Sequence, residues 1–195
     1  MSQQKTPIRL LVGLGNPDDK YLPTRHNVGF WYIDRLAAQH AISLKPEARF
    51  QSLVGTGDID GQRVWLQKPL TYMNHSGRAV AALLRYYKIK VEEMLVAHDD
   101  LDLPAGTIKL KKGGGHGGHN GLRDIIAATG SRDFVRLRIG IGHPGHKNEV
   151  LNWVLGRPGA DDRVAIEQAI ERAVKITPWL VHGDLSRATT WLHSQ

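Results

Sequence analysis

The chain has 195 residues, 41% of them hydrophobic, which suits one well-buried domain and argues against global disorder. It contains no cysteine, which excludes disulfides, thiolate zinc sites and a cysteine nucleophile, and its formal net charge of +7 favours a polyanionic partner. No hydrophobic run reaches the roughly 20 residues of a membrane span, and the N-terminal MSQQKTP has no signal-peptide core, so we expect a cytoplasmic protein.

The first predicted element is a buried strand over residues 8–14, followed by a loop and a helix over residues 30–40. The segment GLGNP ends the strand, and hydrophobic residues recur at helical spacing after Asn27. His26 lies just before the helix, whose N-terminal partial positive charge disfavours a protonated imidazole. A neutral histidine there is a candidate general base, and the alternative is that it only hydrogen-bonds the helix start.

Two strands are predicted next, over residues 49–58 and 63–67, with an Asp-Gly hairpin signal between them. Lys68-Pro69 is expected to end the pair, and a loop over residues 70–74 follows. Ser76 is placed to cap a helix that has a hydrophobic face.

A short buried strand over residues 94–97 runs into the acidic segment HDDLD, and a strand over 107–111 follows. The glycine-rich segment 112–121 cannot form the interior of a helix or a central strand, and a helix opens at its end. The remaining predicted elements are a strand over 134–141 and helices over 149–155, 162–177 and 185–193.

Strands and helices therefore interleave along the whole chain. This order predicts a single α/β domain over residues 1–195, with a mixed, largely parallel sheet that helices cover on both faces. Ligands of such sheets bind at loops beyond the strand ends. The loops of that type are 15–27, 68–75, 98–104, 112–120 and 142–147.

Two familiar kinds of site are disfavoured. The segment GLGNPD only half matches a dinucleotide fingerprint, since its third glycine is Asp18 and the helix begins too late to bind a pyrophosphate. The HGGH and HPGH segments have histidines at metal-like spacing, but no H-E-x-x-H occurs and the glycines place no two histidines on one helical face. Histidines in a glycine-rich, anion-binding surface are the favoured alternative, and we expect no metal.

A metal-free hydrolytic set remains. His26 can take a proton from water, and Asp99, at a strand end, can orient its imidazole. Asp100 and Asp102 are equally acidic, and the pattern does not choose among the three. Loop amides can stabilise an oxyanion or bind a substrate amide, although each is more often a turn residue. These amides are Asn16, Asn74 and Asn120.

Basic residues surround the same loops and indicate phosphate binding, with an ordinary solvated surface as the alternative. They are Lys109, Lys111, Lys112, Arg136, Arg138 and Lys147.

Five segments occur in an order that is similar to bacterial peptidyl-tRNA hydrolases. They are GLGNP with TRHNVG, then KPLTYMNHSG, AHDDLDLPAG, GGGHGGHNGLRDI and RLRIGIGHPG. The resemblance runs from about Arg9 to the C-terminal helices. It implies a monomeric, cytoplasmic, single-domain hydrolase that cleaves the ester between peptide and tRNA, recycles the tRNA, and needs no metal or other cofactor.

The resemblance also implies roles for individual residues. His26 would be the catalytic base and Asp99 its orienting acid. The substrate would be positioned by Asn16, Asn74 and Asn120, and the site lined by Tyr21, Met73 and His119. Phosphates of the tRNA would be held by Lys111, Arg138 and Lys147. The chief departure is Asp18, where the family often has glycine, and it removes no presumed catalytic group.

Two other functions stay open. One is RNA binding without hydrolysis, because some relatives of the family are organelle splicing factors; the presence of His26, Asp99 and the three asparagines disfavours it. The other is a metallohydrolase that uses the HGGH and HPGH histidines, which chelator sensitivity would reveal.

Overall fold

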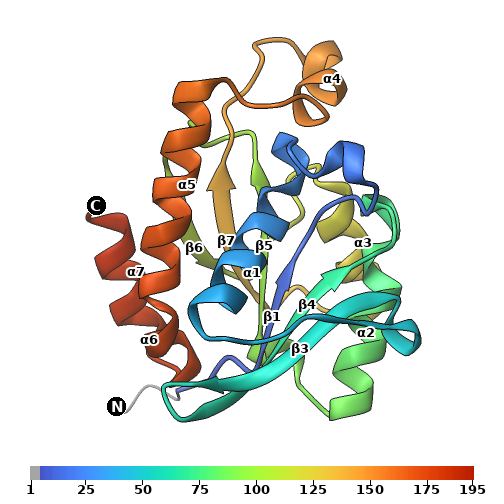
Figure 1. Cartoon of the computed structure of the whole chain (residues 1–195), viewed down its shortest axis with the longest axis vertical. Helices are drawn as coiled ribbons and strands as arrows, with labels where there is room; N and C mark the ends of the chain where they lie inside the picture. Colours follow the sequence, from blue (N-terminus) through green and yellow to red (C-terminus); the bar gives the residue numbers. More distant parts are fainter. Residues whose placement is uncertain (1–4) are drawn as a thin grey trace.

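The computed structural model describes residues 5–195, in which helices cover both faces of a seven-stranded sheet (Figure 1). The central strands are parallel, and the pairings at both edges are antiparallel. This arrangement confirms the predicted mixed, largely parallel sheet. The strands, in sheet order, are β2 (Lys45–Glu47), β3 (Ser52–Ile59), β4 (Gln62–Pro69), β1 (Leu10–Gly13), β5 (Met94–Asp100), β7 (Val135–Gly140) and β6 (Ile108–Lys112).

The helices form two layers around the sheet. They are α1 (Val28–Gln39), α2 (Ser76–Tyr87), α3 (Asn120–Thr129), α4 (Val150–Val154), α5 (Ala160–Lys175), α6 (Thr177–Val181) and α7 (Leu185–His193). Side chains alternate along β1, so Leu10 and Val12 join the core under α2 and α3, whereas Leu11 joins the core under α1 and α5. Within residues 5–195, no helix is both long and hydrophobic enough to cross a membrane.

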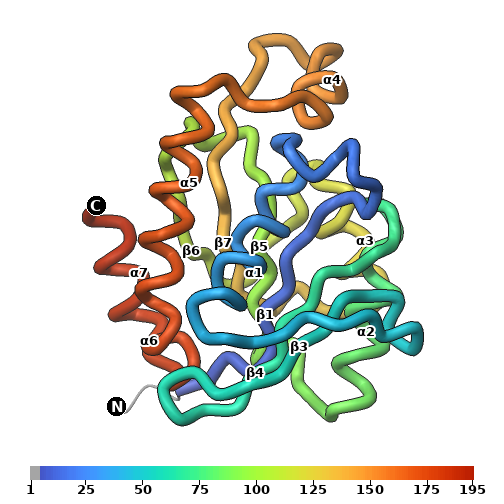
Figure 2. Tube along the Cα trace, in the orientation of Figure 1, coloured from blue at the N-terminus to red at the C-terminus, as the bar shows by residue number. Residues whose placement is uncertain are grey.

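Close packing of α1 on the sheet places the loop that carries His26. The chain leaves β1, loops out beyond the end of the sheet and returns into α1, as the trace shows (Figure 2). A Cβ added at Gly29 would lie 2.5 Å from the carbonyl oxygen of Ala97 and 2.6 Å from the nitrogen of Leu14. Glycine therefore lets the first turn of α1 lie directly on the C-terminal ends of β1 and β5.

Several boundaries differ from the sequence-based expectations. Strand β5 continues to Asp100, and β4 continues to Pro69 instead of ending before Lys68. The short edge strand β2 was not predicted, because its sequence KPE lacks strand-forming residues. The helix expected over 162–177 begins at Ala160 and ends at Lys175.

The predicted capping role of Ser76 is wrong. Ser76 is already helical, and its hydroxyl donates a hydrogen bond to the carbonyl of Met73 at 2.8 Å. A turn over Met73–His75 precedes the helix and supplies this acceptor. The MSQQKTP segment, expected not to be a signal peptide, falls partly outside the described residues, since residues 1–4 are not described.

Candidate active site

Three predicted residues from separate segments meet beyond the C-terminal ends of the parallel strands. His26 lies in the short 3₁₀ helix Arg25–Asn27, Asp99 is near the end of β5, and His119 immediately precedes α3. The Nδ1 atom of His26 lies 2.8 Å from Oδ2 of Asp99, and the Nε2 atom of His119 lies 2.8 Å from Oδ1. One carboxylate thus receives a hydrogen bond from each of two imidazoles.

The tautomer of His119 follows from its second set of partners. Its Nδ1 atom accepts hydrogen bonds from the backbone N–H groups of Gly121 (3.1 Å) and Leu122 (3.3 Å), and so caps the N-terminus of α3. An accepting Nδ1 carries no proton, so the proton of neutral His119 is on Nε2, which donates to Asp99. The helix start therefore fixes the direction of this hydrogen bond.

Asp99 is ionised between the two rings. Burial by itself raises the pKa of Asp99, but the charges and hydrogen bonds of His26 and His119 outweigh it and hold that pKa well below its usual range. For His26, burial by itself lowers the pKa, and the charge and hydrogen bond of Asp99 outweigh it, so the net shift is upward. Since Nδ1 of His26 donates to the carboxylate, its Nε2 atom is the basic lone pair.

His98 is a buried neighbour of this cluster that the sequence pattern does not identify as a site residue. Its Nδ1 atom donates to the carbonyl of Asp99 at 2.8 Å, and its ring packs edge-on against His119 with the centroids 5.2 Å apart. Burial, reinforced by the nearby His119, lowers the pKa of His98, which is therefore neutral at pH 7. The one signal in the sequence that could have identified His98 is its place directly before Asp99 in the acidic segment HDDLD.

The structure separates the three candidate acids. Asp99 contacts His26, whereas Asp100 accepts a hydrogen bond from Nε of Arg138 at 2.8 Å. Asp102 is exposed, and its backbone N–H donates to Asp100. Alternation along β5 separates Asp99 from Asp100, because neighbouring side chains point to opposite faces, and Asp102 lies beyond the end of the strand.

Asn16 joins two of the predicted loops. Its Oδ1 atom accepts from the backbone N–H of Met73 at 2.9 Å, so the amide nitrogen is the end left to donate to a ligand. Asn27 holds the Asn16 backbone through two hydrogen bonds of 2.9 Å, to its N–H and its carbonyl. Nothing in the sequence pattern predicts this supporting role of Asn27.

The other predicted substrate-positioning residues differ in exposure. Asn74 and Asn120 are exposed, Asn120 as the first residue of α3, and Tyr21 is half-buried. Met73 is buried, and its sulfur lies 2.7 Å from where a Cβ of Gly121 would be, so glycine lets this loop approach the start of α3.

Asp18, the departure from the family pattern, makes a contact of its own. Its carboxylate accepts a hydrogen bond from the exposed hydroxyl of Tyr72 at 3.0 Å. This bond, together with the negative charge of Asp18, raises the pKa of Tyr72. The same two loops are therefore joined twice, by the buried hydrogen bond between Asn16 and Met73 and by this exposed one between Asp18 and Tyr72.

The predicted phosphate-binding residues are spread over one edge of the sheet and the loop beyond it. Arg138 on β7 pairs with His98, the residue before Asp99 on β5. Lys111 on β6 pairs with Arg136, two positions closer to the N-terminal end of β7. Lys147 is exposed in the turn before α4. Arg136, counted among the basic residues that indicate phosphate binding, is instead buried and bonded to backbone carbonyls, so it cannot reach a phosphate.

A metal ion does not fit the hydrogen bonds of this cluster. Within residues 5–195, one group of three potential ligands lies within 4.8 Å, namely His26, Asp99 and His119. An ion there would need Nε2 of His119 without its proton, but Nδ1 already accepts two backbone N–H groups and cannot take that proton. In the same part of the chain, no such group includes a histidine of HPGH or His116 of HGGH.

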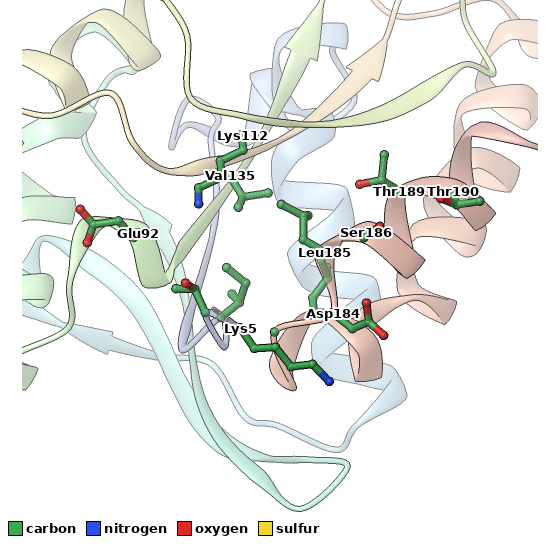
Figure 3. Close-up of a pocket in the computed structure, with 13 residues that line it drawn as sticks. Lys5, Glu92, Lys112, Val135, Asp184, Leu185, Ser186, Thr189 and Thr190 are labelled. Carbon is green, nitrogen blue, oxygen red and sulfur yellow. The ribbon is translucent and has the colours of Figure 1, made fainter. Parts of the chain in front are cut away.

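The cluster is separate from a cavity of about 860 Å³ that lies near the opposite ends of the strands (Figure 3). Its lining includes Lys112 and Val135, which pair at the N-terminal end of β7, and Thr189 and Thr190 of α7. Asp99 is near the other end of β5, so this cavity is not part of the histidine site.

Comparisons with known proteins cover almost the whole chain. The family model described as peptidyl-tRNA hydrolase matches residues 10–195. A peptidyl-tRNA hydrolase of Delftia acidovorans is 53% identical over 96% of this chain and 90% of its own length. One of Coxiella burnetii is 54% identical over 96% of this chain and 98% of its own length.

A solved structure agrees with this similarity. The crystal structure of peptidyl-tRNA hydrolase from Acinetobacter baumannii has 44% sequence identity and a TM-score of 0.96, covering 99% of this chain and 98% of that one. Sequence and fold thus match over nearly the same residues. The chain belongs to the peptidyl-tRNA hydrolase family.

Proposed function

We propose that this protein hydrolyses the ester bond between peptide and tRNA in peptidyl-tRNA, using water that His26 activates. The observation that carries the mechanism is the His26–Asp99–His119 arrangement, which leaves Nε2 of His26 as the basic atom. An ester is reactive enough that a base-activated water can attack it without a stronger nucleophile.

The proton transfers balance within this set of residues. Nε2 of His26 takes a proton from water as the water oxygen attacks the ester carbonyl, and Asp99 stabilises the imidazolium that forms. When the tetrahedral intermediate collapses, the same imidazolium gives the proton to the departing ribose oxygen. The products are tRNA with a free terminal hydroxyl and a peptide carboxylic acid, which then loses its own proton to solvent at neutral pH.

Loop amides would stabilise the negative charge on the attacked carbonyl oxygen. The Asn16 amide nitrogen is directed by the bond between its oxygen and Met73, and exposed amides are offered by Asn74, next to Met73, and by Asn120, at the start of α3. One well-placed donor contributes roughly 2–4 kcal/mol to such a transition state. Tyr21, Met73 and His119 would line the remaining surface of the site.

The body of the tRNA would bind through its phosphates. Lys111, Arg138 and Lys147 would contact them, and the formal charge of +7 would attract the tRNA from a distance. In this proposal the chain acts as one domain over residues 1–195, as a monomer in the cytoplasm, without a metal or other cofactor.

Cleavage of N-acetyl-aminoacyl-tRNA, compared with the same tRNA carrying an unblocked amino acid, tests the function. We expect rapid release of the blocked amino acid, and activity that persists after exhaustive chelation. Tight tRNA binding without cleavage would support the RNA-binding alternative, whereas loss in chelator and recovery with zinc would support a metallohydrolase.

A further inference from the structure

Arg136 is a buried cation on β7 that has no carboxylate partner. Only 2% of its surface is exposed, and no ion pair within residues 5–195 includes it. Its guanidinium donates to the carbonyls of Gly115 (2.6 Å), Gly114 (2.6 Å) and Arg132 (3.2 Å), and it lies over the ring of Phe134. Burying a charge without a carboxylate partner costs folding free energy. An arginine at this position is therefore unexpected unless its hydrogen bonds to these carbonyls serve the structure or the reaction.

Two of these carbonyls, those of Gly114 and Gly115, belong to a loop whose first residue, Gly113, donates its N–H to the carbonyl of Phe134 at 3.0 Å. Residues 113–118 form no helix or strand, and Gly113, Gly114, Gly117 and Gly118 have positive φ. Glycines in such conformations are flexible unless other groups fix them. Among the described residues, Arg136 is the only group that hydrogen-bonds the backbone of Gly114 or Gly115.

This loop leads directly into the catalytic cluster. Four residues after Gly115, the ring of His119 donates to Asp99, and Asn120 begins α3. Arg136 lies opposite Val96 of β5, three positions before Asp99 on the same strand. The sheet thus holds the loop at two levels, through Arg136 near its beginning and through Asp99 at its end.

We propose that Arg136 is a positioning residue for hydrolysis: by bonding the glycine loop to β7, it sets where His119 and Asn120 stand relative to Asp99. It acts through the loop and touches neither substrate nor phosphate. The two terminal nitrogens of the planar guanidinium hold the adjacent carbonyls of Gly114 and Gly115 in a fixed geometry, whereas all donors of a lysine ammonium radiate from a single, freely rotating nitrogen. The catalytic part of this inference rests on the proposed function.

The test uses Arg136→Lys, which keeps the charge and removes the planar fork, and Arg136→Met, which removes both. The matched control is Arg132→Met, since Arg132 is exposed in the same region and contributes only its backbone carbonyl to the contact. The first measurement is amide hydrogen exchange over residues 114–120 without substrate. We expect faster exchange there in Arg136→Lys and wild-type exchange in the control.

The second measurement is hydrolysis of N-acetyl-aminoacyl-tRNA at a temperature where each variant is folded by circular dichroism. We expect Arg136→Lys to lower kcat roughly 10–100-fold, the effect of displacing catalytic groups by about 1 Å, with KM and its salt dependence unchanged. A merely structural residue would lower the melting temperature without lowering kcat in the folded enzyme.

Three results would overturn the inference. One is wild-type exchange and kcat in Arg136→Lys, and another is a lowered melting temperature with normal kcat. The third is an unchanged kcat with a raised KM and a weaker salt dependence, which would make Arg136 a phosphate ligand. Inactivity of the wild-type protein would instead refute the proposed function, and hydrogen exchange would still test the contact between Arg136 and the loop.

Discussion

At the scale of single residues, the site depends on one carboxylate that holds two imidazoles. We expect Asp99→Asn to lower kcat by roughly 10²–10⁴, because an amide can favour the wrong tautomer of His26 and cannot stabilise its cation. Asp100→Asn is the matched control, since Asp100 bonds Arg138 and not a histidine. Steady-state kinetics on N-acetyl-aminoacyl-tRNA distinguish the two; equal losses of kcat would refute the orienting role of Asp99.

The pH dependence of the reaction follows from the same pair. His26 must be neutral to accept a proton, and Asp99 raises its pKa, so kcat/KM should fall as the pH drops through a value above the ordinary 6.5 or so of histidine. In Asp99→Asn, burial still lowers the pKa of His26, but the negative charge that raised that pKa is gone. The acid limb of the residual activity should therefore move to lower pH, and an unmoved limb would assign it to another group.

At the scale of elements, the placement of His26 depends on how closely α1 approaches the sheet. Gly29→Ala would put a methyl group 2.5 Å from the backbone oxygen of Ala97, and backbone cannot rotate away as a side chain can. We expect about 1–3 kcal/mol of destabilisation, the usual cost of overpacking, and a reduced kcat because the helix start moves. Thermal unfolding and kinetics measure both effects.

The control for that change is Gly159→Ala. A Cβ at Gly159 has no neighbour within 4 Å, and its φ of −62° suits any residue. Gly159 is the N-cap of α5, where alanine is less favourable than glycine, so this variant should lose some stability but react like the wild type. If Gly29→Ala behaved the same way, the close approach of α1 would not be what positions His26.

At the scale of the whole molecule, sequence periodicity predicted most strands and helices and the fold class, because hydrophobic burial decides them locally. The partners of polar side chains could not be predicted in this way. Arg136 and Arg138 alternate identically with hydrophobic neighbours, yet one is buried under a glycine loop and the other pairs with Asp100. The pattern likewise left Asp99, Asp100 and Asp102 equivalent until the sheet register placed one of them beside His26.

The proposed tRNA-binding surface is a property of the assembled sheet. Lys111 and Arg138 come from adjacent strands, and both lie on the face opposite to the one where Ile108 and Leu110 of β6 join the core. Phosphate contacts release counterions, so binding weakens linearly in log salt, with a slope that depends on the number of phosphates neutralised. Replacing both residues by alanine should therefore raise KM for peptidyl-tRNA and reduce the salt slope by roughly one for each phosphate that is no longer neutralised.

A second substrate separates this binding from chemistry. A minimal N-blocked aminoacyl ester without the tRNA body offers few phosphates to bind, so the double variant should cleave it at nearly the wild-type rate. The control variant is Lys45→Ala with Lys175→Ala, which removes the same two charges from exposed positions on β2 and α5. If the control flattened the salt dependence as much, net charge alone would explain it; if the double variant were inactive on both substrates, Lys111 and Arg138 would act in folding or catalysis rather than in phosphate binding.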